Sequence, residues 1–458
     1  GSRYSRKYED LLLNRFILIE FGLSFFCTFS AMFCFWISAY TIHFGLVVYS
    51  LVCMIGFMTG LEIPLIMRIN QTYESLRENI SSVMEYDYYG GLLGGALFAF
   101  VLLPFLGLTY TPVLIGSLNL LVASLVLWHF SNHLVRPRIL NIQFTALLII
   151  SVLAFSVAKP IVLYGEQHKY KDKIIYQEQT RYQKIVVTQW KDNFWLFING
   201  STQFSTYDEE RYHEPLVHPV MSLLKEHKDI LLLGAGDGLA AREILKYSDV
   251  ESLTLVDLDP AMTRLARQHK MFLEINQGSL NDTRVRVINK DAYQFMKESP
   301  DLYDAIIIDL PDPKSVSLSL LYSLGFYKMV EKHLKPFGAM VTQSTSPLYS
   351  PEAFLCIKKT MQAANFSTLP YQNSVPSMGQ WGWVLGIRKK TMPANRLKQE
   401  IIAQKLSDIE TRFFNQNAMI SMANFGKGLF EKEDKIEPNT QFNHNILKYY
   451  RQGSWDLY

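Results

Sequence analysis

The chain has 458 residues, of which 49% are hydrophobic and 13% aromatic, and its formal net charge is +3. A charge this close to neutral gives no signal for nucleic-acid binding, so we expect no nucleic-acid partner. The four cysteines are spaced neither as a disulfide framework nor as metal ligands, and we expect no metal site: Cys27, Cys34, Cys53 and Cys356.

The first third of the chain is strongly apolar. A bilayer is crossed by about 20 helical residues, and five runs reach that length: Phe16–Tyr40, Phe44–Met67, Gly90–Leu108, Pro112–Phe130 and Phe144–Tyr164. A buried helical core is the alternative, but short polar loops between the runs favour a membrane. We therefore predict a transmembrane helical domain over residues 1–164. Because the chain opens Gly1-Ser2 without a methionine, we expect further helices upstream.

Charged residues in this region bear on function and orientation. Glu20, Glu62 and Asp87 lie in or near the apolar runs, where a carboxyl is costly and is by default a functional hypothesis. Glu62 is the best candidate, and the alternative is an acid that only orients helices. Arginines in the second and fourth loops favour a cytoplasmic start and an external C-terminal part. Lysines 169, 171 and 173 favour the opposite, so the sidedness stays open.

The next segment, residues 165–212, predicts a small antiparallel β-sheet domain. Lys173–Val187, Asn193–Asn199 and Gln203–Ser205 alternate or are rich in β-branched and aromatic residues. Asn199-Gly200 is typical of a hairpin turn.

Residues 213–392 predict a doubly wound, Rossmann-like α/β domain with a mostly parallel sheet, because strand and helix patterns alternate. The expected strands are Ile230–Leu233, Ser252–Val256, Val285–Asn289, Ala305–Asp309, Gly338–Gln343 and Trp383–Ile387. The expected helices lie near Ala240–Tyr247, Pro260–His269, Ala292–Glu298, Leu320–Leu334 and Pro351–Ala364. Residues 393–458 predict a polar helical tail docked on this domain.

A glycine-rich turn follows the first of these strands, in Ile230-Leu-Leu-Leu-Gly-Ala-Gly-Asp-Gly238. Gly234 and Gly236 let the backbone turn tightly and approach a ligand. Asp237 stands where a pyrophosphate would need the positive helix N-terminus, so a cationic ligand fits better. Asp257 ends the second strand, where a carboxylate binds ribose hydroxyls, and Asp291-Ala292 follows the third, placed to meet an adenine edge. The pattern indicates an S-adenosylmethionine-type ligand.

The fourth strand ends in Asp309-Leu-Pro-Asp-Pro313, at the edge where open α/β sheets bind ligands. Two neighbouring carboxylates suit a cationic polyamine, and one of them can accept a proton from it. An alkyl ammonium has a pKa near 10, so it attacks only after deprotonation. The alternative is that the motif caps the following helix, which fits Asp312 but does not explain Asp309.

Over about Tyr164–Arg388 the chain resembles the spermidine synthase (polyamine aminopropyltransferase) family. The matching motifs include Tyr182-Gln183, Tyr212-His213-Glu214, Gly234-x-Gly-Asp-Gly238, Asp309-x-x-Asp-Pro313 and Gly379-Gln-Trp-Gly382. Gly60-Leu-Glu-Ile-Pro64 and the Asp87-Tyr-x-Gly90 segment are similar to the integral-membrane branch of that family.

The resemblance implies transfer of the aminopropyl group of decarboxylated S-adenosylmethionine to a diamine such as putrescine, giving spermidine and 5′-methylthioadenosine. Asp309 is then the implied proton acceptor. The implied donor-binding residues are Gln183, Asp237, Asp257, Asp291, Ala292, Gly234 and Gly236, and the implied acceptor-binding residues are Tyr212, His213 and Asp312. Decarboxylated S-adenosylmethionine would be a co-substrate, with no permanently bound cofactor.

The same resemblance implies a multi-pass protein of the cell membrane, with the lipid bilayer and the amine as partners, a cytoplasmic catalytic domain and a homodimer. The identity of the amine acceptor stays open. Two other functions stay open as well: an S-adenosylmethionine-dependent methyltransferase, and a polyamine-binding membrane transporter or sensor without catalysis.

Overall fold

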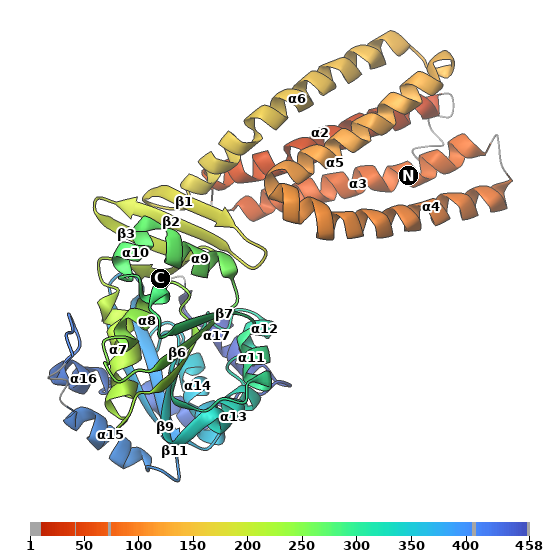
Figure 1. Cartoon of the computed structure of the whole chain (residues 1–458). Helices are drawn as coiled ribbons and strands as arrows, with labels where there is room; N and C mark the ends of the chain where they lie inside the picture. Colours follow the sequence, from red (N-terminus) through yellow and green to blue (C-terminus); the bar gives the residue numbers. More distant parts are fainter. Residues whose placement is uncertain (1–10, 42, 72–74, 405–408, 456–458) are drawn as a thin grey trace. The chain divides into compact units, whose positions relative to one another are not determined.

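The computed structural model describes residues 11–41, 43–71, 75–404 and 409–455 of the chain (Figure 1). The chain divides into two compact units, Gly1–Ile174 and Ile175–Tyr458. The second unit holds both the small sheet and the larger one, so the finer domain boundaries proposed from the sequence stay predictions.

Within the described residues of the first unit, four helices are long and apolar enough to cross a membrane: α2 (Leu12–Ser38), α3 (Phe44–Asn70), the run Arg77–His129, and α6 (Pro137–Gln167). A 27-residue helix reaches about 40 Å at 1.5 Å per residue, more than the roughly 30 Å hydrocarbon core. α2 contacts α3, α5 and α6, which makes it the central helix of this bundle.

The run Arg77–His129 replaces two helices that the sequence predicted as separate. It consists of α4 (Leu76–Leu97), a π-helical turn (Phe98–Leu102) and α5 (Leu103–His129). Gly107 interrupts it with φ 61° and ψ −170°, a conformation that L side chains rarely adopt. Figure 1 shows the chain reversing direction between α4 and α5. The five expected segments therefore correspond to four helices, one of which contains a break.

The acids of this unit differ in burial. Glu20 on α2 is only 4% exposed, whereas Glu62 on α3 is half-buried and Asp87 on α4 is exposed. Glu62 had been the preferred candidate for function, but Glu20 is the acid that the helices enclose most fully.

The second unit begins with a four-stranded sheet in the order β1-β2-β3-β4. Its strands are β1 (Lys173–Gln179), β2 (Lys184–Trp190), β3 (Asn193–Ile198) and β4 (Ser201–Ser205). The predicted run Lys173–Val187 is therefore two strands. Asn199 and Gly200 have φ of 51° and 80°, and they join the antiparallel strands β3 and β4 as the sequence predicted.

A seven-stranded sheet follows, in the order β10-β11-β9-β8-β5-β6-β7. Its strands are β5 (Asp229–Gly234), β6 (Ser252–Asp257), β7 (Val285–Asn289), β8 (Tyr303–Asp309), β9 (Leu334–Gln343), β10 (Phe366–Val375) and β11 (Gly379–Arg388). β5 to β9 pair in parallel, and β11 pairs antiparallel with both β9 and β10. β10 was missed from the sequence.

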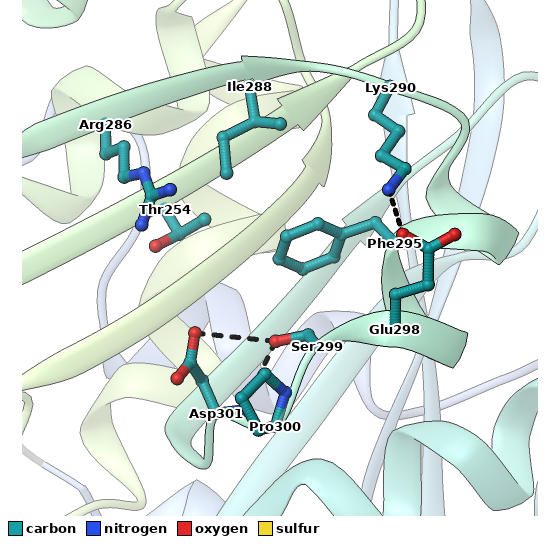
Figure 2. Close-up of a pocket in the computed structure, with 9 residues that line it drawn as sticks. All are labelled: Thr254, Arg286, Ile288, Lys290, Phe295, Glu298, Ser299, Pro300 and Asp301. Atoms are coloured by element: carbon teal, nitrogen blue, oxygen red, sulfur yellow. Dashed lines mark hydrogen bonds and ion pairs between the residues drawn. The ribbon is translucent and has the colours of Figure 1, made fainter.

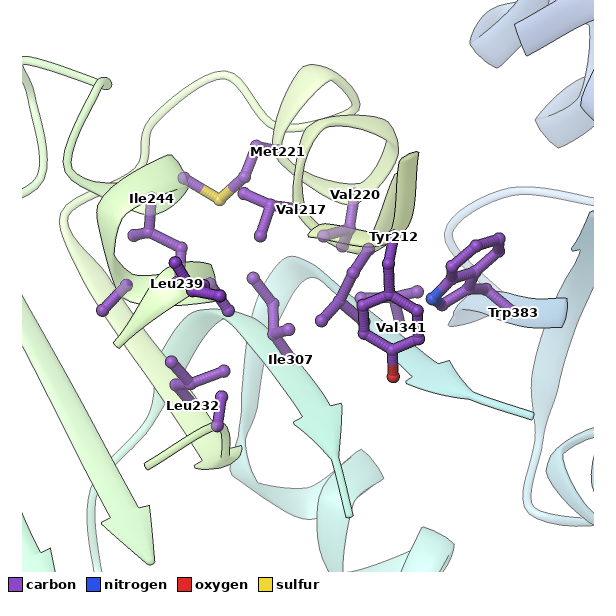
Figure 3. Packing of buried hydrophobic residues seen from close by; sticks show 14 of the residues in the cluster. Tyr212, Val217, Val220, Met221, Leu232, Leu239, Ile244, Ile307, Val341 and Trp383 are labelled. Atoms are coloured by element: carbon purple, nitrogen blue, oxygen red, sulfur yellow. The ribbon is translucent and has the colours of Figure 1, made fainter. Parts of the chain in front are cut away.

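Both faces of this sheet are buried, which explains the continuous apolar runs in its strands. Leu232, Ile307 and Val341 face one core with α7 (Glu210–Ser222) and α8 (Leu239–Ile244), as Figure 3 shows. Leu231, Leu233 and their neighbours on β8 face a second core. That core includes residues of α11 (Ala292–Glu298), α13 (Leu324–His333) and α14 (Pro351–Ala363). The predicted doubly wound architecture is confirmed for this sheet.

Three helical features departed from the sequence prediction. α7 was not predicted, because Pro215 and Pro219 within it argue against a helix. The region expected as one helix at 320–334 is α12 (Val316–Leu320), a turn, and α13. After β6 the predicted helix is confirmed as α9 (Pro260–Gln268), and a second short helix that was not predicted, α10 (Lys270–Ile275), follows it. The tail contains α15 (Ala394–Ala403), α16 (Gln416–Met422) and α17 (Asn445–Arg451).

Candidate active site

In the seven-stranded sheet, the direction in which successive strands are placed reverses between the neighbouring strands β5 and β8. From β5 the chain adds β6 and β7 on one side, and from β8 it adds β9 on the other. Gly234 and Asp309 are paired at the carboxyl ends of these two strands. Loops that leave neighbouring strands in opposite directions open a crevice at such a point, and ligands of open α/β sheets bind there.

The turn after β5 is shaped for close approach. Gly234 has φ 82°, and a Cβ there would stand 2.0 Å from the carbonyl oxygen of Asp309. A Cβ on Gly236 would stand 2.5 Å from Oδ2 of Asp257. The Gly236 N–H donates to that same oxygen at 3.1 Å, so the turn binds the acid at the end of β6. Asp237 accepts the N–H of Leu239 at 2.8 Å, at the start of α8.

Asp309 is held by α7 from across the sheet edge. The hydroxyl of Tyr212 donates to Oδ1 of Asp309 at 2.5 Å. The Tyr212 ring packs against Trp383 with centroids 5.4 Å apart, and Figure 3 shows its hydroxyl pointing away from the apolar residues of α7. A buried aromatic contact thus fixes the donor that orients the Asp309 carboxylate.

Three aspartates at this edge are difficult to ionise together. Burial raises the pKa of Asp309 to about 6, with the charge of Asp237 adding to the rise, while His213 and the Tyr212 hydrogen bond oppose it. Burial likewise raises the pKa of Asp257 to about 6 and raises that of Asp237. A cationic ligand would relieve this repulsion, because an opposite charge favours the carboxylates.

His213 is oriented by a buried ionic network. Its Nδ1 lies 3.0 Å from Oε2 of Glu209, which also accepts from Arg242 at 2.9 Å. Burial alone would lower the pKa of His213, but the hydrogen bond and charge of Glu209 raise it. Burial opposes ionisation of Glu209 too, yet His213, Arg242 and Arg412 lower its pKa to about 2. Glu209 therefore favours the protonated form of His213, whose charge would lower the pKa of Asp237 and Asp309.

Asp312 lies in a second set of polar contacts. Its Oδ2 accepts the Tyr450 hydroxyl at 2.9 Å, and its Oδ1 lies 3.4 Å from Nε2 of Gln343. Gln343 also donates to the hydroxyl of Tyr322 at 2.5 Å and to the carbonyl of Leu310 at 2.6 Å. Burial raises the pKa of Asp312, against the charge of Lys314 and these hydrogen bonds.

The remaining predicted residues lie at the ends of other elements. Gln183 is in the turn between β1 and β2, where its N–H donates to Thr180 Oγ1 at 2.9 Å. Thr180 in turn donates to Asp259, just after β6, at 2.8 Å. Asp291 follows β7 and caps α11 by accepting the N–H of Gln294 at 2.9 Å, and Ala292 is buried beside it. Hydrogen bonds therefore join Gly236 to Asp257 and Tyr212 to Asp309, whereas Asp291 is engaged by its own helix.

A pocket of about 290 Å³ lies elsewhere, on the face of the sheet beside α11 (Figure 2). Figure 2 shows that its lining includes an ion pair between Lys290 and Glu298 and a hydrogen bond between Ser299 and Asp301. It contains none of the predicted site residues. The convergence of carboxylates at the switch point, rather than this surface pocket, marks the candidate active site.

Sequence reasoning missed several residues of the site. Gln343 ends β9, and the rule that selected Asp309 at the end of β8 would have found it. Glu209 stands four residues before His213, a spacing at which helical side chains meet. Tyr450 carried no signal, because 138 residues separate it from Asp312 and only the folded tail brings them together.

Comparison with known proteins agrees with this geometry. Residues 209–399 match the family model of the spermine/spermidine synthase domain. The fold is similar to that of a spermidine synthase solved with the transition-state analogue AdoDATO, at a TM-score of 0.52 and 24% identity over 57% of this chain and 89% of that one. The spermidine synthase of Thermotoga maritima gives a TM-score of 0.51 at 24% identity, over 57% of this chain and 88% of that one.

Curated relatives match over nearly the whole chain. The polyamine aminopropyltransferase of Oceanobacillus iheyensis is 39% identical over 98% of this chain and 85% of its own length. That of Leptospira interrogans is 36% identical over 98% of this chain and 88% of its own. The catalytic unit is thus a Rossmann-like domain of the spermidine synthase type. The chain belongs to the polyamine aminopropyltransferase family.

Proposed function

We propose that this protein transfers the aminopropyl group of decarboxylated S-adenosylmethionine to a diamine such as putrescine, with spermidine and 5′-methylthioadenosine as products. The observation that best supports this proposal is the position and environment of Asp309. Its carboxylate lies at the switch point, with a pKa raised to about 6 and a hydrogen bond from Tyr212. A general base whose pKa lies near the working pH combines availability with basicity.

The reaction needs a neutral amine. The acceptor's ammonium loses its proton to Asp309, and the amine then attacks the aminopropyl carbon bonded to the sulfonium. The carbon–sulfur bond breaks as the carbon–nitrogen bond forms, and a neutral thioether leaves. The protonated form of His213, which Glu209 favours, would stabilise the Asp309 carboxylate before the proton arrives.

The donor is expected to lie along the ends of β5, β6 and β7. Gly234 and Gly236, which have no side chain, would let the donor approach the backbone closely. Asp257 would bind the hydroxyls of its ribose. Asp237 and Gln183 would face the cationic aminopropyl arm, and Asp291 with Ala292 the adenine. The raised pKa values of Asp237 and Asp257 support a cationic ligand at this edge.

The acceptor is expected on the other side of Asp309, between α7 and the segment that follows β8. Tyr212, His213 and Asp312 would line it. Asp312 would bind the ammonium that does not react, at a fixed distance from the base. The proposed reaction needs no metal and no permanently bound cofactor.

The apolar helices support a multi-pass anchor in the lipid bilayer of the cell membrane. The break at Gly107 supports five crossings rather than four, since it divides a run of 53 residues. We place the catalytic unit on the cytoplasmic side, where S-adenosylmethionine derivatives are made, and expect a homodimer. Protease accessibility in sealed vesicles tests the sidedness.

Donor choice is the test that separates this function from its alternatives. The detergent-solubilised full chain is given putrescine with either decarboxylated or intact S-adenosylmethionine, and products are followed by mass spectrometry. We expect methylthioadenosine and spermidine from the decarboxylated donor alone. Methylated product from intact S-adenosylmethionine would instead identify a methyltransferase, and binding of the amine without turnover a transporter or sensor.

A further inference from the structure

The C-terminal helix α17 contributes a side chain to the candidate acceptor site. Tyr450 is only 7% exposed, and its hydroxyl donates to Oδ2 of Asp312 at 2.9 Å. Asp312 is half-buried at the carboxyl edge of the sheet, three residues after Asp309. A phenol that donates to a half-buried carboxylate fixes that carboxylate in one orientation and leaves its other lone pairs available.

Tyr450 is itself held firmly by the end of the chain. Its backbone oxygen accepts the indole N–H of Trp455 at 2.8 Å, and the two rings lie 4.5 Å apart. Ser454 donates its N–H to the backbone oxygen of Tyr349 at 2.8 Å. The ring of Tyr349 also lies against Gly379 at the start of β11, where a Cβ would approach it to 2.8 Å. The tail therefore joins the site to the Gly379-Gln-Trp-Gly382 motif.

We propose that Tyr450 is a positioning residue of the acceptor site, which orients Asp312 toward the distal ammonium of an aliphatic diamine and closes that end of the site. This rests on the function proposed above. Because Tyr450 meets Asp312 rather than Asp309, it acts on recognition of the acceptor and not on proton removal. The buried ring behind the hydroxyl then limits the length of amine that the site accepts.

Several groups face Asp312 and set its ionisation: Tyr450 from α17, Gln343 and Thr345 from β9 and the residues after it, and Lys314 from its own loop. Tyr212 and Tyr322 lie close enough to interact with its charge. The Tyr450 hydrogen bond lowers the pKa of Asp312, so its removal raises that pKa. Since the ionised form binds the ammonium, the acid limb of kcat/KM for the diamine must then move to higher pH.

The test compares Tyr450→Phe with the wild-type full chain. We expect the KM for putrescine to rise at least about tenfold, as for loss of one hydrogen bond to a charged group, with the donor KM and kcat little changed. The acid limb of kcat/KM should move to higher pH. Tyr450→Ala, which also removes the ring, should in addition improve the use of longer amines relative to putrescine.

Tyr449→Phe is the matched control, because this neighbouring hydroxyl meets the N–H of Glu437 at 3.3 Å and not Asp312. It should leave acceptor kinetics unchanged. If the wild type transfers normally and Tyr450→Phe changes neither the putrescine KM nor the pH profile, the inference about Tyr450 is wrong while the proposed function stands. A wild-type chain that neither transfers to nor binds putrescine by calorimetry would overturn the proposed function, and this inference with it.

Discussion

At the scale of single residues, the site concentrates carboxylates that resist ionisation. The pKa of Asp309 rises from 3.8 to about 6, chiefly through burial. Ionisation of Asp309 is therefore less favourable in the folded chain than in the unfolded chain, which lowers stability at neutral pH. Such a cost is expected where function rather than stability selects the residue.

Asp309→Asn removes the proposed base while keeping the shape of the side chain. We expect kcat to fall on the order of 10²- to 10⁴-fold, as for loss of a general base. The melting temperature at pH 7 should stay equal or rise, because the wild-type carboxylate loses stability as the pH rises from 3.8 through about 6 and the amide does not.

Asp304→Asn, at the opposite end of β8, is the control. Asp304 lies 2.9 Å from the ammonium of Lys335 and is remote from the switch point. Its loss should leave kcat nearly unchanged and lower stability slightly. An Asp309→Asn enzyme of normal kcat would remove Asp309 from the mechanism.

Tyr212→Phe isolates the hydrogen bond to Asp309. That bond lowers the pKa of Asp309, so its loss raises the pKa. We expect the acid limb of kcat/KM, near pH 6 in the wild type, to move to higher pH with the ring packing preserved. A limb that stays in place or moves to lower pH would contradict the assigned contact.

At the scale of elements, the β5–α8 turn depends on the missing side chain of Gly236. A Cβ there would meet Oδ2 of Asp257 at 2.5 Å, so Gly236→Ala should displace that carboxylate and raise the donor KM at least about tenfold, on the order of a lost charged hydrogen bond. Steady-state kinetics with varied donor would measure it. Gly426→Ala, where no atom lies within 4 Å of the added Cβ, is the control and should change neither KM nor kcat.

Elements with local signals were predictable from the sequence. Strands β5, β6 and β8 were found because their residues are mostly apolar and buried on both faces of the sheet. The Asn199-Gly200 turn was found because a type I′ turn demands such residues. α7 was missed because its two prolines mask a helix that tertiary packing stabilises, and α4 and α5 were expected as separate spans although the structure runs helix through to a break at Gly107.

In the candidate site, too, the residues with a local sequence signal were predictable. Asp309 and Asp257 were found because they end strands whose carboxyl ends meet at one edge. Gln343 obeys the same rule, since the predicted strand Gly338–Gln343 ends on it, but it was not selected as a site residue. Tyr450 and Arg412 could not be predicted, because their contacts depend on how the tail folds back and no local pattern encodes that path.

At the scale of the whole molecule, the chain combines an apolar helical unit with a catalytic unit. From the four long apolar helices among the described residues, we predict that the full chain stays in the membrane fraction after alkaline carbonate extraction and enters solution only with detergent. A soluble control enzyme in the same preparation should be released. Release of the chain without detergent would contradict the membrane assignment and leave the catalytic proposal untouched.

We expect the switch-point carboxylates to perform the proposed aminopropyl transfer. The most direct measurement is product formation by the purified full chain supplied with decarboxylated S-adenosylmethionine and putrescine, beside Asp309→Asn of equal melting temperature. We expect equimolar spermidine and methylthioadenosine from the wild type and almost none from the variant. Equal yields from both proteins, or methyl transfer from intact S-adenosylmethionine in place of aminopropyl transfer, would contradict it.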